Sequence, residues 1–296
     1  MPVVFGLLNV NKPPGMSSYD VIRRVRRCVG RKLKVGHAGT LDPLAEGVLV
    51  VCLGPATRLV PLIQAGEKEY AVDAELGAFT STDDREGERR GVPDAPVPTA
   101  GAVAEAVARF VGTIQQTPPA YSAVKVAGRR AYEIARRGAA PEIAPRAVTV
   151  HGIEVQGYDW PVLRLRVVCG SGTYVRSLVR DIGEALGTGG YCLRIVRTRV
   201  GAFAAADACR IDDLQPEGIG ALLIDPLAAV PAGARVAVDA AALRAFAHGQ
   251  AAPAAAPPGG ADLLAAVGPG GELAALVRFD RAAGVLRPVK VFVGSR

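Results

Sequence analysis

Apolar residues in the first thirty positions recur at two spacings, which predict a strand followed by a helix. Residues 3–10 are mostly apolar, as in a buried strand, and the Lys12-Pro13-Pro14-Gly15 segment then turns the chain. Ser18 is the predicted N-cap of the helix and Gly30 its stop. Arginines occupy the exposed face, and the apolar face carries Val21, Ile22, Val25, Cys28 and Val29.

Two further patterns predict strands in the next segment. Residues 48–53 are uninterruptedly apolar, as in a strand buried on both faces, whereas residues 69–76 alternate apolar and polar like a half-buried strand. The charged run at residues 83–90 is predicted to be a solvated loop. Thr99 is predicted to cap a helix that extends to Phe110.

The middle of the chain again mixes helices and strands. Residues 129–137 are predicted to be a basic helical stretch, residues 163–167 a strand, and residues 174–186 an amphipathic helix. Because strands and helices alternate without regular βαβ repetition, the predicted fold is α+β, with a mixed, largely antiparallel sheet.

The composition shifts near residue 232 to alanine, proline and glycine. Two strands are predicted beyond it, at residues 272–279 and 284–293, joined by a turn at 280–283. We therefore expect two domains: a catalytic domain at residues 1–231 and a small β module at residues 232–296.

Charge and cysteine content narrow the class of protein. The 296 residues carry a net charge of +7, which favours a nucleic-acid partner because lysine and arginine neutralise phosphates. The five cysteines form no C-x-x-C pair, and with three scattered histidines they provide no metal-ligand spacing. Free thiols are typical of a reducing compartment, and no signal sequence or membrane span is apparent, so we expect a cytoplasmic protein without metal or cofactor.

The segment at residues 36–49 contains three glycines, His37 and a single aspartate, Asp42, before Pro43. One interpretation is structural, with Asp42 as a helix N-cap and Pro43 at the first helical position. The other is an active-site loop in which the glycines permit close approach to a reactive carboxylate. His37 likewise has a structural and a functional interpretation, and the local pattern does not decide between them.

Arg176 occupies an unfavourable position in the first turn of its predicted helix. There its positive charge opposes the helix dipole, which indicates a partner carboxylate or phosphate. Tyr70 and Tyr174 are by default packing residues of a strand and of a helix start.

Five motifs in order carry a resemblance to a known family. They are residues 6–18 (GLLNVNKPPGMSS), 36–47 (GHAGTLDPLAEG), 68–70 (KEY), 116–125 (QTPPAYSAVK) and 172–176 (GTYVR). Over roughly residues 5–205 the chain resembles the TruB family of bacterial tRNA pseudouridine-55 synthases. The resemblance implies a catalytic domain of pseudouridine synthase type, and more weakly a PUA-like C-terminal RNA-binding module.

The resemblance also assigns roles to the singled-out residues. Asp42 is implied to be the essential nucleophile, by attack on C1′, by attack on C6, or by removal of a ribose proton. Arg176 would keep Asp42 ionised, and Tyr70 and Tyr174 would hold the uracil. His37 would fill the stack left by a uridine flipped out of the tRNA T-loop. The arginine-rich helix would contact phosphates, and the enzyme is expected to act as a monomer without a protein partner.

One motif departs from the family pattern. Where the family commonly carries Leu-Arg-Arg, this chain has Ile195-Val196-Arg197, which places Ile195 at the pocket-lining leucine position and preserves an apolar wall. Two alternatives to the isomerase remain: a non-catalytic tRNA-binding or tRNA-folding protein, and an aspartate-dependent nucleoside hydrolase. Asp42 with Arg176 and Tyr70 favours the isomerase, because binding alone needs no carboxylate near a polyanion.

Overall fold

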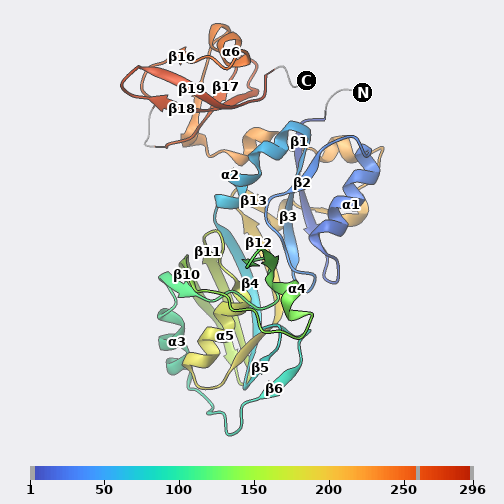
Figure 1. The fold of residues 1–296 in the computed structure, drawn as a ribbon, viewed down its shortest axis with the longest axis vertical. Coiled ribbons are helices and arrows are strands. Elements are labelled where there is room, and N and C mark those ends of the chain that lie inside the picture. The colour runs from blue at the N-terminus through green and yellow to red at the C-terminus, as the bar shows by residue number, and fades with distance from the viewer. Residues whose placement is uncertain (1–3, 258–260, 294–296) are drawn as a thin grey trace.

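A ten-stranded mixed sheet forms the body of the protein in the computed structural model, which describes residues 4–257 and 261–293 (Figure 1). Its neighbours pair antiparallel except at β1–β14 and β3–β12, so the α+β prediction is confirmed. In sheet order the strands are β14 (Cys209–Arg210), β1 (Gly6–Lys12), β3 (Glu46–Leu53), β12 (Gly190–Val200), β4 (Lys68–Leu76), β11 (Val162–Cys169), β10 (Arg146–Asp159) and β7 (Gly112–Gln116), with β2 (Val35–His37) beside β3 and β13 (Phe203–Ala204) beside β12.

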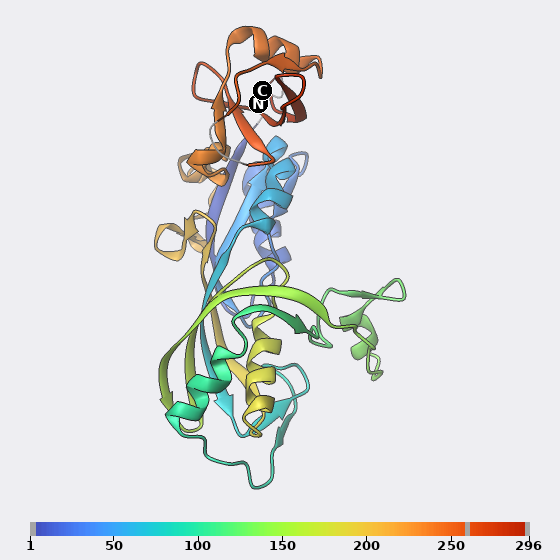
Figure 2. The same cartoon turned by 90° about the vertical axis from the view of Figure 1, so that its left-hand side faces the viewer.

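The helices pack at the edges and faces of this sheet. Figures 1 and 2 show the first helix beside β2 and β3, and the third and fifth helices together near the opposite end. The helices are α1 (Ser18–Val29), α2 (Val60–Ala65), α3 (Ala100–Ala108), α4 (Ala131–Ala135), α5 (Val175–Ala185) and α6 (Ala240–Ala247).

Strand β3 is apolar throughout because both of its faces are buried. Leu49 and Val51 face the core formed with α1, whereas Val48 and Val50 face a second cluster that includes Ile63 from α2. Successive side chains of a strand point to opposite faces, so only a continuous apolar run satisfies both cores.

The cap of helix α1 differs from the prediction by one residue. Ser17, not Ser18, is the N-cap, and it forms a capping box with Asp20. The Ser18 hydroxyl is buried instead, where it accepts from the Leu41 N–H at 2.8 Å and donates to the Leu41 carbonyl at 2.9 Å. The start of α1 is thereby joined to the segment that contains Asp42. Gly30 ends the helix with φ +88°, as predicted.

The predicted helical stretch at residues 129–137 is wrong in its first part. Residues Arg129–Arg130 form strand β9, which pairs with β8 (Lys125–Val126), and only Ala131–Ala135 are helical. Gly128 at the hairpin turn has φ +82°, a conformation that favours a tight reversal over a continuous helix. A similar small hairpin pairs β5 (Ala78–Thr80) with β6 (Arg89–Gly91).

A second, five-stranded sheet lies at one end of the long axis (Figure 1). Both strands predicted for this region are present, and the sheet adds three short strands and α6. Phe292 stacks on Phe5 at 5.5 Å between ring centroids, and Lys290 donates to the Arg58 carbonyl at 2.8 Å. The strands in order are β15 (Arg235–Ala237), β17 (Leu264–Val267), β18 (Leu273–Asp280), β19 (Val285–Val291) and β16 (Ala252–Pro253).

Candidate active site

A cavity of about 700 Å³ opens between the start of α5, strands β4 and β12, and the loops at residues 39–43 and 121–123. Five of the six residues singled out from the sequence line it: Asp42, Tyr70, Tyr174, Arg176 and Ile195. Segments that are far apart in the sequence therefore converge on one site.

Asp42 lies in the loop between β2 and β3. No helix follows it, so the interpretation of Asp42 and Pro43 as a helix start is wrong. The Pro43 carbonyl accepts from the Gly15 N–H at 2.8 Å, which ties this loop to the turn after β1. The side chain of Asp42 stays 38 % exposed toward the cavity, so a substrate has access to its carboxylate.

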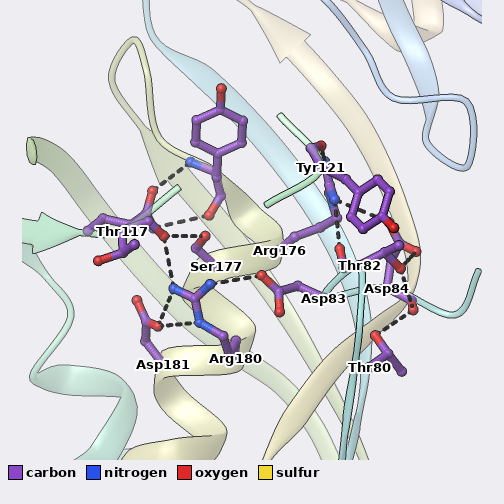
Figure 3. A network of polar contacts seen from close by, with 12 residues as sticks. Thr80, Thr82, Asp83, Asp84, Thr117, Tyr121, Arg176, Ser177, Arg180 and Asp181 are labelled. Carbon is purple, nitrogen blue, oxygen red and sulfur yellow. Dashed lines mark hydrogen bonds and ion pairs between the residues drawn. The ribbon is translucent and has the colours of Figure 1, made fainter. Parts of the chain in front are cut away.

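Arg176, in the first turn of α5, joins Asp42 to two other segments. Its Nε and Nη2 atoms lie 2.9 and 2.8 Å from Oδ2 of Asp42. The guanidinium also donates to the carbonyls of Thr82 and Tyr121, at 2.7 and 3.1 Å (Figure 3). These partners explain the unfavourable position of a cation at a helix N-terminus.

The charge of Arg176 is held in place despite its burial. Its side chain is 4 % exposed, and burial alone would lower its pKa. The carboxylates of Asp42 and Asp84 outweigh that effect and raise the pKa of Arg176 above its ordinary value. The guanidinium is therefore a permanent cation beside Asp42.

The run at residues 83–90 is not simply a solvated loop. Asp83 and Asp84 are buried, and they form ion pairs with Arg180 at 2.8 Å and with Arg176 at 3.4 Å. Asp84 also accepts from the Thr82 hydroxyl at 2.6 Å (Figure 3). Nothing local in the sequence distinguishes these two aspartates from the exposed charges after them, because their partners are on α5.

Replacing Asp84 with asparagine tests its part in this network. The amide is nearly isosteric with the carboxylate but uncharged, so Arg176 would lose one of its two carboxylates and orient Asp42 less firmly. We expect single-turnover activity to fall about 10- to 100-fold, which corresponds to roughly 1.4 to 2.7 kcal/mol of transition-state stabilisation. Glu88→Gln, an uncharged change in the exposed part of the same loop, is the matched control. Unchanged activity in the Asp84→Asn variant would contradict this role.

The two tyrosines enter the cavity from different elements. Tyr174 precedes α5, where its backbone exchanges two hydrogen bonds with the Gln116 side chain, and Arg146 lies 5.1 Å from its ring centroid. Tyr70 is on β4, where burial raises the pKa of its phenol while the charge of Arg197 acts in the opposite direction. Ile195, on β12 opposite Val72, is 4 % exposed and forms an apolar wall.

His37 is the site residue that the structure places elsewhere. It ends strand β2, paired with Val51, and does not line the cavity that contains Asp42. Burial lowers its pKa, with a further lowering from Arg197, so the imidazole favours its neutral form. A role for His37 in the RNA stack stays a prediction.

The residue types that ligate metals are scattered over the described part of the chain. In residues 4–257 and 261–293, no group of three or more histidine, cysteine, aspartate or glutamate side chains is arranged to hold a metal ion. The cysteines are free thiols, and burial raises the pKa of Cys52 to about 12. Helices in the same residues are too short or too polar to cross a membrane.

Comparisons with known proteins agree with this geometry. The model of the TruB family pseudouridylate synthase N-terminal domain matches residues 26–175, and that of the tRNA pseudouridylate synthase B C-terminal domain matches residues 176–219. The tRNA pseudouridine synthase B of Thermobifida fusca is 41 % identical, covering 98 % of this chain and 99 % of the relative. That of Symbiobacterium thermophilum is 44 % identical, covering 83 % and 82 %.

Solved structures show the same fold. A Cbf5–Nop10–Gar1 complex contains a chain with a TM-score of 0.70 and 28 % identity, covering 93 % of this chain and 78 % of that one. An H/ACA RNP bound to a substrate RNA containing 2′-deoxyuridine gives a TM-score of 0.73 at 26 % identity, covering 99 % and 86 %. The chain belongs to the TruB family of pseudouridylate synthases.

Proposed function

We propose that this protein isomerises uridine to pseudouridine at position 55, in the T-loop of tRNA. The observation that carries the proposal is the carboxylate of Asp42, exposed to a large cavity and held by the buried Arg176. A binding protein for a polyanion gains nothing from such a carboxylate, whereas an isomerase needs one as nucleophile or base. The tRNA pseudouridine synthases among its relatives support the same reaction.

The isomerisation conserves atoms and requires no outside reactant. The bond from N1 to ribose C1′ breaks, the uracil rotates, and C5 bonds to C1′ before it loses its proton. Asp42 attacks C1′, attacks C6 or removes a ribose proton, and the cavity geometry is compatible with each of these routes. The faces of Tyr70 and Tyr174 would hold the base while leaving it free to rotate.

The partner we propose is the T-stem-loop of tRNA, bound as a folded RNA. Extruding the uridine from its stack costs a few kcal/mol, which contacts with backbone phosphates would offset. His37 is proposed to fill the vacated stack. Residues 1–231 would form the catalytic domain and residues 232–296 a PUA-like RNA-binding module, in a cytoplasmic protein that acts as a monomer.

The decisive test is an assay of the purified protein on an unmodified tRNA transcript, with the modified position mapped. Pseudouridine at position 55, and no other change, is the expected result. Pseudouridine at another position would contradict the T-loop assignment. Tight tRNA binding without any isomerisation would instead favour the tRNA-folding alternative.

The exposed face of α1 provides a separate prediction about RNA binding. Arg24 and Arg27 line a groove of about 390 Å³ and form no ion pair with any described residue, unlike Arg23, which pairs with Asp20. Replacing both with glutamine should weaken tRNA binding and lower the slope of log K against log salt by about 2, one per phosphate contact. Binding titrations at several salt concentrations measure this slope. Arg109→Gln, after α3, is the control, and an unaltered slope would place the RNA elsewhere.

A further inference from the structure

Three buried cations lie at or beneath the cavity without a carboxylate partner. Lys12, Lys68 and Arg197 are 0, 7 and 2 % exposed, and none forms an ion pair within the described part of the chain. Arg176, by contrast, is balanced by Asp42 and Asp84. The other three side chains therefore leave uncompensated positive charge around the site.

Each of these cations is solvated by backbone carbonyls alone. Lys12 donates to three carbonyls, including that of Pro43 beside Asp42, at 2.6 to 3.3 Å. Arg197 donates to the carbonyls of Gly39, Thr40 and Val48 at 2.7 to 3.2 Å. Lys68 donates to the carbonyls of Gln64 and Gly66, at the end of α2.

Holding carbonyls in place does not by itself require charge. Burying an unpaired cation costs several kcal/mol, and a neutral amide makes hydrogen bonds to carbonyls at lower cost. Lys12 shows the strain of this arrangement, since burial lowers its pKa to about 8, which still leaves it cationic at pH 7. The retained charges indicate a use beyond anchoring the backbone.

Two of the cations flank the ring on which the uracil is proposed to stack. Lys68 and Tyr70 are two residues apart on β4, so their side chains point to the same face. Arg197 is the residue opposite Tyr70 on β12. All three line the cavity. Lys68 also has a third N–H, beyond the two that bond the carbonyls after α2.

Negative charge develops on the uracil in each of the three routes. When C1′ is attacked or a ribose proton is removed, the N1–C1′ bonding pair leaves with the uracil, which becomes an anion over N1 and O2. When C6 is attacked, the electrons of the C5–C6 double bond pass to C5 and O4 as an enolate. Rejoining at C5 and loss of the C5 proton then return the ring to neutrality.

We propose that Lys68 is a catalytic residue that donates its free N–H to this charged uracil, while Arg197 and Lys12 add fixed positive charge from beneath the site. Preorganised donors and charges aimed at developing charge stabilise a transition state in a water-poor cavity. The assignment rests on the proposed isomerisation and names a further group that acts in it.

The test compares two substrates in one variant. Lys68→Met removes the charge and should slow single-turnover conversion of uridine about 100-fold. On a T-stem-loop with 5-fluorouridine at the target position, fluorine withdraws electrons and stabilises the anion itself. The loss in N1–C1′ cleavage should therefore be several-fold smaller on that substrate. Lys68→Gln, which keeps a donor for the carbonyls but no charge, should show the same pattern and is the second variant if Lys68→Met fails to fold.

The controls separate this assignment from a structural role. Arg164→Met removes an exposed charge from the neighbouring strand β11 and should leave both rates unchanged. Equal losses on the two substrates, or no loss on uridine, would overturn the role of Lys68. A wild-type protein that isomerises neither substrate would overturn the proposed function together with it.

Discussion

Asp42→Asn should abolish pseudouridine formation while leaving tRNA affinity within several-fold of the wild type. The amide has nearly the same shape and still accepts from Arg176, but it is a poor nucleophile and base. We expect the single-turnover rate to fall by at least about 10⁴-fold, or about 5.4 kcal/mol of transition-state stabilisation. Tritium release from C5-labelled uridine measures this rate, and filter binding measures the affinity.

The informative comparison is with a carboxylate on the same loop that does not reach the cavity. Glu46 lies at the start of β3 and pairs with Arg194, so Glu46→Gln removes one negative charge nearby. It should retain turnover close to that of the wild type. Measurable turnover by the Asp42→Asn variant, free of wild-type contamination, would remove Asp42 from the chemistry.

Arg176→Met should damage stability and catalysis together. The change leaves Asp42 and Asp84 without their shared cation and leaves the Thr82 and Tyr121 carbonyls without a donor. Breaking a buried ion pair from one side costs roughly 3 to 5 kcal/mol of unfolding free energy. Denaturant unfolding should show this loss, and the activity of the remaining folded protein should fall by several orders of magnitude.

A lysine at the same position separates charge from geometry. Arg176→Lys keeps the positive charge but has no planar fork, so it cannot serve four oxygen atoms on several segments at once. We expect partial recovery of stability and little recovery of activity. If Arg176→Lys were as active as the wild type, charge alone would explain its contribution, and the positioning role of Arg176 would be wrong.

Local patterns along the chain were sufficient to predict the main elements. The apolar face of α1, the doubly buried β3 and the alternating β4 follow from the helical and strand periods, which depend only on backbone geometry. The position of Arg176 against its helix dipole even indicated an anionic partner. Where the prediction differed by a residue, at Ser17 and Ser18, both serines were acceptable caps and a tertiary bond to Leu41 decided between them.

The sequence by itself determined the class of fold, the segment around Asp42 and, through its motifs, the family. Only the tertiary structure decided that Arg176 meets Asp42 across 134 residues, and that Asp84 is buried in the same network. It also decided that the Asp42 loop is not a helix start, and that Lys68 and Arg197 flank Tyr70 without counter-charges in the described part of the chain. Such contacts arise from the packing of distant strands, and no local period encodes which distant side chain will fill the space.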